Sequence, residues 1–192
     1  MQPIAHSERL LAVVGPSGAG KDSVLNAWRA LLLSSAYGEA MAPHHARRVI
    51  TRAADPGGEA HEPVDEATFI ALRNAGELVL HWQAHGLFYG VRSRDLQPLQ
   101  QGRWVVVNAS RAHLPALLAA APAARVVEIT APAPLLAQRL AHRAREDAAA
   151  VQARLARLVP PSNADFVVHN TGDVRAAAQR LQAWWRCVSP AR

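Results

Sequence analysis

Short apolar runs alternate with amphipathic stretches along this chain of 192 residues. Apolar runs bounded by turn residues are typical of strands in a parallel sheet, and apolar positions three or four apart are typical of helices. We expect strands at residues 9–15, 47–51, 104–108, 125–130 and 165–170, and helices at 22–33, 111–121, 134–145, 147–158 and 173–187. This alternation predicts an α/β fold with a mainly parallel core sheet of five strands.

The middle of the chain breaks the alternation with more glycine, histidine and loop signals. Its pattern predicts a loop at 52–64, a helix at 65–74, a strand at 77–84, a turn at 86–90 and a short helix at 93–101. His44 and His45 are expected in an exposed loop. We therefore expect one domain, with a core of about 1–33 and 103–192 and an inserted substrate-binding region of about 34–102.

Composition describes an ordinary globular chain. Half of the residues are apolar and 19% are charged. The apolar runs are too short to span a membrane, and the first residues lack the pattern of a signal peptide. A single cysteine, Cys187, cannot form an internal disulfide, so we expect a cytoplasmic protein.

The net charge of +6 favours polyanionic partners. The basic residues are spread along the chain, and they are not interleaved with aromatic residues as in many RNA-binding segments. We therefore expect a small phosphorylated substrate, with no nucleic acid or membrane as partner. The sequence leaves open whether the protein is a monomer or a homodimer.

Only one of the twenty-one basic residues is a lysine, and it lies in Gly15-Pro16-Ser17-Gly18-Ala19-Gly20-Lys21. An ammonium is a compact point charge that fits inside a loop around a phosphate chain, whereas a guanidinium is a broad planar fork. Backbone N–H groups of such a loop bind phosphate oxygens, and the following helix directs its positive end at them. An apolar strand precedes this loop and an amphipathic helix follows it, so we predict that it binds the phosphates of ATP.

The residue after the lysine is Asp22, where phosphate loops usually carry a serine or threonine that binds Mg²⁺. A carboxylate beside a triphosphate is repelled unless a cation lies between them. Asp22 and Ser23 are therefore candidate Mg²⁺ ligands, either through Asp22 itself or with Ser23 supplying the hydroxyl. The alternative is that Asp22 only favours the start of the helix electrostatically.

Several segments resemble those of guanylate kinases. The phosphate loop does, and so do Thr51-Arg52 followed by Gly58-Glu59, and the run at 86–91, Gly-Leu-Phe-Tyr-Gly-Val. Arginines at 139, 143 and 154 resemble the arginine-bearing lid of that family, here about residues 139–157. The resemblance covers nearly the whole chain and implies a phosphate-loop NTPase fold.

The positions that would read guanine depart from that family. Asp55 stands in place of the second acceptor arginine, and His81 in place of the glutamate that would read the base. Asn108 and Ser110 replace an Asp-x-Asp pair, and Asn108 also stands where many phosphate-loop enzymes carry a metal-organising aspartate. With these departures, the segments at 15–23, 49–52, 81–86, 89–90 and 106–111 resemble ribose 1,5-bisphosphate phosphokinases of phosphonate degradation.

That second resemblance implies ATP- and Mg²⁺-dependent phosphorylation of ribose 1,5-bisphosphate on its 1-phosphate. Lys21 would hold the ATP phosphates, and Arg139, Arg143 and Arg154 would close over the transferring group. The acceptor phosphates would be bound by Arg52, Arg48, His81 and Tyr89. Two alternatives remain open: a nucleoside monophosphate kinase of the guanylate kinase type, and a module of that fold without catalysis. The phosphate loop and the lid arginines argue against the module, because a binding module does not need them.

Overall fold

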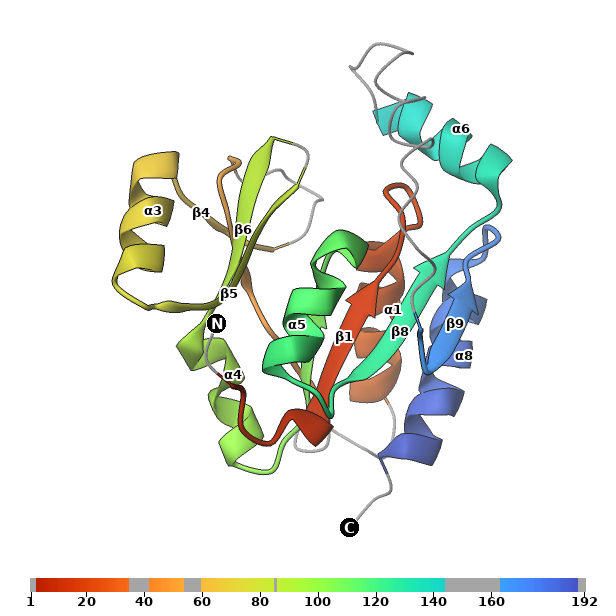
Figure 1. The fold of residues 1–192 in the computed structure, drawn as a ribbon. Coiled ribbons are helices and arrows are strands. Elements are labelled where there is room, and N and C mark those ends of the chain that lie inside the picture. Colours follow the sequence, from red (N-terminus) through yellow and green to blue (C-terminus); the bar gives the residue numbers. More distant parts are fainter. Residues whose placement is uncertain (1–2, 35–41, 54–59, 85, 144–162, 190–192) are drawn as a thin grey trace. The chain divides into compact units, whose positions relative to one another are not determined.

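The computed structural model describes residues 3–34, 42–53, 60–84, 86–143 and 163–189, with the backbone alone at 140–143 (Figure 1). Five strands form a parallel sheet in the order β2-β7-β1-β8-β9, and four form a second sheet in the order β4-β3-β6-β5. The predicted α/β fold with a parallel five-stranded sheet is confirmed.

Two compact units make up the chain. We call residues 13–42 and 126–192 the loop unit, because they include the glycine-rich segment. Residues 1–12 and 43–125 are the hairpin unit, named after the β5–β6 pair. The proposed boundaries of core, acceptor-binding region and lid stay predictions.

The loop unit is built around paired helices. Its elements are β1 (Leu10–Val14, which begins in the hairpin unit), α1 (Lys21–Leu33), β8 (Arg125–Thr130), α6 (Ala133–Arg143), β9 (Phe166–His169) and α8 (Val174–Val188). Helices α1 and α8 pack together, and the indoles of Trp28 and Trp185 meet edge to face at 5.3 Å. Both indoles are fully buried, so Trp28 and Trp185 hold the two helices together by packing.

The hairpin unit contains the second sheet and the helix α3 (Figure 1). Its strands are β2 (His44–His45), β3 (Arg48–Ile50), β4 (Glu62–Pro63), β5 (Leu78–Ala84), β6 (Leu87–Arg92) and β7 (Val105–Asn108). Its helices are η1 (Ser7–Arg9), α3 (Glu66–Asn74), α4 (Ser93–Gln100), η2 (Arg111–His113) and α5 (Leu114–Ala120). Asp65 caps α3 by accepting a hydrogen bond from the Thr68 amide at 2.7 Å, which satisfies one of the free N–H groups at the helix start.

The turn expected at residues 86–90 is confirmed at Gly86 and wrong beyond it, because residues 87–92 form strand β6. This strand pairs with both β5 and β3, and tertiary pairing overrides the local preference of its one glycine, Gly90. Gly90 serves close packing: a Cβ there would lie 2.9 Å from Leu78 and 3.2 Å from Phe69, which belong to the core of this sheet. Glycine within a strand marks such close approach as well as turns.

The exposed loop expected at His44 and His45 is also wrong. Both residues are half-buried in β2, which pairs in parallel with β7 through His44–Val105 and His45–Val106. A two-residue strand is too short to show a hydrophobic period, so the sequence could not reveal it. The helix expected at 147–158 lies outside the described residues. Within the described ranges, none of the helices has the length and apolarity needed to cross a bilayer.

Candidate functional site

The glycine-rich segment joins the end of β1 to the start of α1, as the sequence predicts. Gly15 has φ 152°, and a Cβ there would lie 1.9 Å from the backbone oxygen of Ile129 in β8. Gly18 and Gly20 are left-handed, with φ 84° and 78°. A side chain at Gly15 would have to displace backbone, so the path of the loop depends on this glycine.

Lys21 is the first residue of α1, and its ammonium returns to the start of the loop. Its Nζ donates to the carbonyl oxygens of Gly15, at 3.1 Å, and Pro16, at 3.3 Å. The charge is therefore held at the loop and away from the outer surface of α1. This is the position from which a lysine can pair with phosphates bound by the loop.

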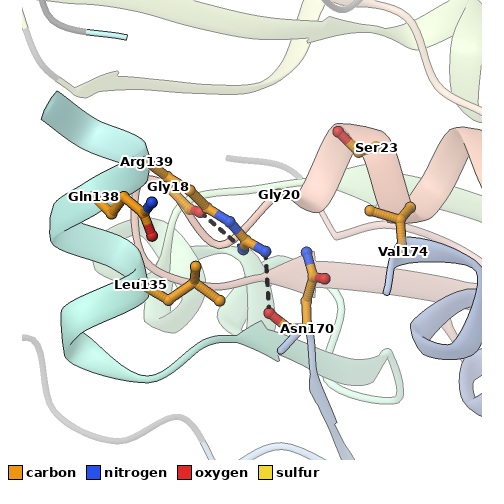
Figure 2. Close-up of a pocket in the computed structure, with 8 residues that line it drawn as sticks. All are labelled: Gly18, Gly20, Ser23, Leu135, Gln138, Arg139, Asn170 and Val174. Atoms are coloured by element: carbon orange, nitrogen blue, oxygen red, sulfur yellow. Dashed lines mark hydrogen bonds between the residues drawn. The ribbon is translucent and has the colours of Figure 1, made fainter. Parts of the chain in front are cut away.

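Two side chains from distant parts of the loop unit brace the segment from outside. Asn170, which follows β9, donates from Nδ2 to the Ala19 oxygen at 2.8 Å and is almost completely buried. Arg139 of α6 donates to the oxygen of Gly18 at 3.4 Å and to the oxygen of Asn170 at 3.3 Å (Figure 2). It also donates to the oxygen of Ala19 at 3.4 Å. These bonds tie α6 and the end of β9 to the loop.

A cavity of about 410 Å³ lies beside this brace. Figure 2 shows the residues that line it, which come from the loop, α1, α6 and the segment after β9: Gly18, Gly20, Ser23, Leu135, Gln138, Arg139, Asn170 and Val174. The Oδ1 atom of Asn170 is buried and has no hydrogen-bond partner among the described residues. A cavity with apolar walls and a few fixed polar groups beside an anion-binding loop is suited to a nucleotide.

The predicted catalytic arginines differ in what the structure says of them. Arg139 contacts backbone oxygens of the loop. Arg143 is the last residue of α6, and only its backbone is described. Arg154 and most of the proposed lid lie outside the described residues. The closing of these arginines over a transferring group stays a prediction.

The two candidate Mg²⁺ ligands lie in the first turn of α1. Ser23 is exposed and lines the cavity, and Asp22 is half-buried. A hydroxyl and a carboxylate are the oxygen donors that Mg²⁺ takes, usually together with substrate phosphates and water. No cluster of three or more His, Cys, Asp or Glu side chains occurs in the described part of the chain. The donor set therefore fits a metal shared with a bound nucleotide, and the metal role of both residues stays a prediction.

In the hairpin unit, four side chains form a continuous stack. The ring of Tyr89 lies parallel to the indole of Trp82 at 5.5 Å, and the imidazole of His113 lies on Trp82 at 5.0 Å. The guanidinium carbon of Arg48 is 5.3 Å from the centre of the Tyr89 ring. The structure thus brings together two of the predicted acceptor-binding residues, Arg48 and Tyr89, in a cation–π contact.

His81 does not belong to this stack. Neighbouring side chains of a strand point to opposite faces, so His81 lies on the face of β5 opposite to Trp82. Burial lowers the pKa of His81, and the positive charge of Arg73 in α3 lowers it further. Burial also lowers the pKa of His113 to about 4, with a smaller effect from His81. Both imidazoles are therefore neutral near pH 7.

Arg52, the other predicted acceptor ligand, is exposed just beyond the end of β3. The preceding residue, Thr51, is fixed to β6 by two hydrogen bonds. The amide of Thr51 donates to the Phe88 oxygen at 3.1 Å, and the Phe88 amide donates to Thr51 Oγ1 at 2.8 Å. The threonine side chain therefore supports the backbone that carries Arg52. Asp55, Gly58 and Glu59 lie outside the described residues.

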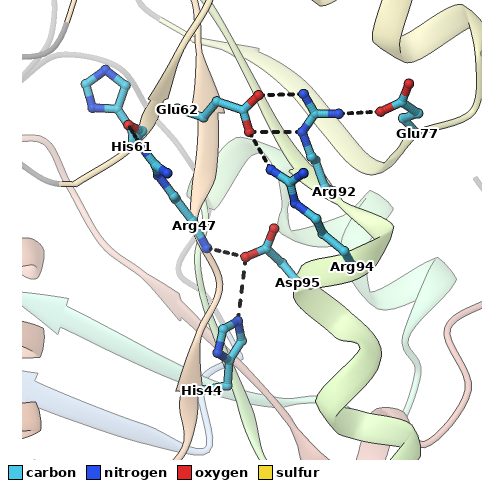
Figure 3. A network of polar contacts seen from close by, with 8 residues as sticks. All are labelled: His44, Arg47, His61, Glu62, Glu77, Arg92, Arg94 and Asp95. Atoms are coloured by element: carbon cyan, nitrogen blue, oxygen red, sulfur yellow. Dashed lines mark hydrogen bonds and ion pairs between the residues drawn. The ribbon is translucent and has the colours of Figure 1, made fainter.

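Arginine–carboxylate pairs join β4 to β6 and α4 (Figure 3). Glu62 accepts from Arg92 through both oxygens and from Arg94 at 3.0 Å, and Arg92 also pairs with Glu77. The hydrogen bond from Arg92 is the main cause of the lowered pKa of Glu62. Nearby, Asp95 accepts from the Arg47 amide at 2.9 Å and lies 3.5 Å from His44.

Comparison with known proteins decides the family. The chain is 45% identical over 179 residues to ribose 1,5-bisphosphate phosphokinase PhnN of Ruegeria sp., covering 91% of this chain and 90% of that protein. The chain belongs to the ribose 1,5-bisphosphate phosphokinase family. It is also 48% identical over 174 residues to the bifunctional ribose 1,5-bisphosphokinase-thymidine phosphorylase of Azorhizobium caulinodans. That alignment covers 89% of this chain and only 24% of the bifunctional protein.

The fold comparison agrees with this family. Guanylate kinase from Anaplasma phagocytophilum superposes with a TM-score of 0.66, covering 95% of this chain and 86% of that one, at 20% identity. At this identity the likeness supports the fold alone, which is that of the phosphate-loop kinases. No protein-family model matches the chain.

The sequence interpretation missed Asn170, Trp82 and His113. Asn170 could have been found, because ligands in parallel α/β sheets bind at the carboxyl ends of strands and Asn170 follows β9 directly. Trp82 lies two positions after Leu80 and on the same buried face of β5, so the pattern indicated only a core position. His113 carries no local signal, since its contact with Trp82 joins residues far apart in the chain.

Proposed function

We propose that this protein transfers the γ-phosphoryl group of ATP to the 1-phosphate of ribose 1,5-bisphosphate, giving 5-phospho-α-D-ribose 1-diphosphate and ADP. The observation that carries the proposal is the 45% identity to a ribose 1,5-bisphosphate phosphokinase over nearly the full length of both chains. The phosphate loop and its lysine support a kinase more than a binding module.

ATP would be held by the loop unit. Its phosphates would lie in the segment from Gly15 to Ser23, against Lys21, with the base and ribose in the cavity beside Asn170. Asp22 and Ser23 would hold Mg²⁺, which when bound would supply positive charge against the charge that develops on transfer. Arg139 would fix α6 to the loop through the backbone oxygens that it contacts.

The acceptor would be held by the hairpin unit. Ribose 1,5-bisphosphate carries two phosphates and no base, so its site needs cations and hydrogen-bond donors. Arg52 and Arg48 supply the cations, and the stack on Tyr89 restricts the plane of the Arg48 guanidinium. His81, which is neutral and lies on the other face of β5, would contribute at most a neutral hydrogen bond.

The reaction needs no general base. An oxygen of the ionised 1-phosphate attacks the γ-phosphorus, the bond from that phosphorus to the bridging oxygen breaks, and ADP leaves with the electron pair. Placement and charge neutralisation lower the barrier, and no proton has to be removed from the nucleophile.

The proposal is tested by incubating the protein with ATP, Mg²⁺ and one acceptor at a time, and by following ³¹P NMR. Ribose 1,5-bisphosphate should give the coupled resonances of a diphosphate ester together with ADP. Ribose 5-phosphate, which lacks the 1-phosphate, is the matched control and should give no product. Turnover with GMP but not with ribose 1,5-bisphosphate would contradict the proposal, and absence of turnover with both would favour a non-catalytic module.

A further inference from the structure

The connection between β3 and β4 is short for two parallel strands. Val49 pairs with Glu62 and Ile50 with Pro63, so only residues 51–61 join the strands. Parallel neighbours usually need a crossover of about a dozen residues or more.

His61 links the two ends of this connection. Its Nε2 lies 3.0 Å from the backbone oxygen of Arg52, and its side chain is almost completely buried. A carbonyl oxygen can only accept, so Nε2 must carry the hydrogen of this bond. On the other side, the oxygen of His61 accepts from Nη2 of Arg47 at 2.8 Å (Figure 3). The imidazole therefore closes a ring from Arg52 to His61, and Arg47 holds that ring.

The next residue strengthens the same closure. Glu62 is bound by Arg92 and Arg94, which fixes β4 to β6 and α4. The amide of Val64 donates to the Ile50 oxygen at 3.1 Å, and Thr51 is bonded to Phe88. Contacts therefore anchor the chain on both sides of the connection, at Thr51 and Arg52 and at His61, Glu62 and Val64. The side chain of Arg52 is exposed on a backbone held from both directions.

We propose that His61 is a positioning residue for the acceptor: its Nε2–H fixes the backbone of Arg52 and so places the Arg52 guanidinium for a substrate phosphate. This inference rests on the proposed function, which assigns Arg52 to the acceptor. An arginine on a fixed backbone loses less conformational freedom when it binds, and the affinity for the acceptor rises accordingly. His61 itself does not have to touch the substrate.

The first test compares three substitutions at His61 by steady-state kinetics. The amide of His61→Gln keeps an N–H near the position of Nε2. The side chain of His61→Asn is shorter and places its amide near the position of Nδ1, so it does not reach the oxygen of Arg52. His61→Phe keeps the ring without a donor. We expect His61→Phe and His61→Asn to raise KM for ribose 1,5-bisphosphate about 10-fold, as for one lost hydrogen bond. KM for ATP should change less than about 2-fold, and His61→Gln should restore most of the acceptor affinity.

A double-mutant cycle with Arg52→Ala separates positioning from general stability. If His61 acts through Arg52, His61→Phe should add little to the rise in KM already caused by Arg52→Ala. Independent effects that multiply would overturn the proposal, and so would an equal rise in KM for ATP and for the acceptor.

Hydrogen exchange keeps the inference testable apart from the activity. In His61→Phe, the Val64 amide should exchange at least about 10-fold faster than in wild type, while amides of α1 and α8 stay unchanged. If wild type does not phosphorylate ribose 1,5-bisphosphate, the proposed function fails, and unchanged exchange at Val64 would overturn the link between His61 and Arg52 independently. Faster exchange at Val64 with an unchanged acceptor KM would overturn the positioning role.

Discussion

The two units of this protein build their candidate sites from different kinds of groups, one mainly from the backbone and the other mainly from side chains. In the loop unit, the site is mostly backbone: glycines in unusual conformations, carbonyl oxygens bound by Lys21 and Arg139, and a single buried amide at Asn170. In the hairpin unit, side chains dominate. Arginines pair with carboxylates, and Arg48, Tyr89, Trp82 and His113 stack.

This difference separates two tasks. A backbone cradle binds any phosphate chain, and it depends on glycines that cannot be exchanged without displacing other backbone. A site of side chains can change its ligand by exchange of single residues. A kinase that keeps its donor and changes its acceptor would therefore vary mainly in the hairpin unit. His81 and Asn108 depart from the guanylate kinase pattern there, and Asp22 is a departure within the loop unit.

The largest expected effect is on catalysis at Lys21. Lys21→Ala should lower kcat by about 10³-fold, because it removes the charge that we propose stabilises the transferring phosphate. The midpoint of thermal unfolding should change little, since the side chain is only half-buried. Lys21→Arg is the control, because it keeps the positive charge but replaces the compact ammonium with a broad guanidinium. It should not restore activity. Recovery of a tenth or more of the wild-type kcat in that variant would contradict the argument from the single lysine.

The next effect is on stability and tests the dependence of the loop unit on backbone contact. Gly15→Ala should lower the free energy of unfolding by roughly 3 kcal/mol or more, because its Cβ would meet the Ile129 oxygen at 1.9 Å. Gly172→Ala is the matched control in the same unit, with φ 132° and no atom within 4 Å of the added Cβ. It should cost about 1 kcal/mol. Equal losses in denaturant unfolding would show that backbone conformation alone explains both glycines.

The buried His113 predicts pH dependence in the hairpin unit. Its pKa falls from 6.5 to about 4 in the folded protein, so between these values the unfolded chain binds the extra proton. Stability from the neutral imidazole is present above pH 6.5 and is lost as the pH falls towards 4, by roughly 2–3 kcal/mol. His113→Phe should lose less stability over this range. Parallel pH profiles for both proteins in urea unfolding would contradict the prediction.

A smaller effect is expected at Asn170. Asn170→Ala removes the bond to the Ala19 oxygen and should raise KM for ATP about 10-fold, as for one buried hydrogen bond. KM for the acceptor should stay within about 2-fold of wild type, since Asn170 belongs to the loop unit. An equal rise in both constants, measured by varying each substrate in turn, would break the proposed division of tasks.

The smallest effect is expected at Glu62, in the ion-pair network. Glu62→Gln should cost roughly 1 kcal/mol at pH 7, because the pairs are partly exposed. The pKa of Glu62 is lowered by Arg92, so the stability that it contributes is present above about pH 4.3 and is lost as the pH falls further. This window lies below that of His113. The stability difference between Glu62→Gln and wild type should stay constant between pH 6.5 and 5. A difference that changes within this range would contradict the prediction.

The loop unit was predictable from the sequence because its signals are local. An apolar run, three glycines, a lysine and an amphipathic helix follow one another directly between Leu10 and Leu33. The brace at Asn170 was not predicted, since its partner Ala19 lies 151 positions away. The roles proposed for Asp22, Ser23, Arg143 and Arg154 rest on the sequence and stay predictions.

The hairpin unit was less predictable, and the reasons are physical. Strand β6 contains two aromatic residues and a glycine, and its strand character depends on partners on both sides. The stack on Trp82 joins β3, β5, β6 and η2, which no sequence period relates. Beside the pairing of β4 with β3, the contacts of His61 and Glu62 come from Arg47, Arg52 and Arg92, which no local pattern relates to them.

The account is tested most directly by the ratio of kcat/KM for ribose 1,5-bisphosphate to kcat/KM for GMP, with ATP and Mg²⁺ held constant. In this account the loop unit holds ATP whatever the acceptor, and the hairpin unit selects a bisphosphate without a base. The ratio should therefore be above about 10². A ratio near or below one would contradict the account, because it would show that the hairpin unit still selects a nucleotide.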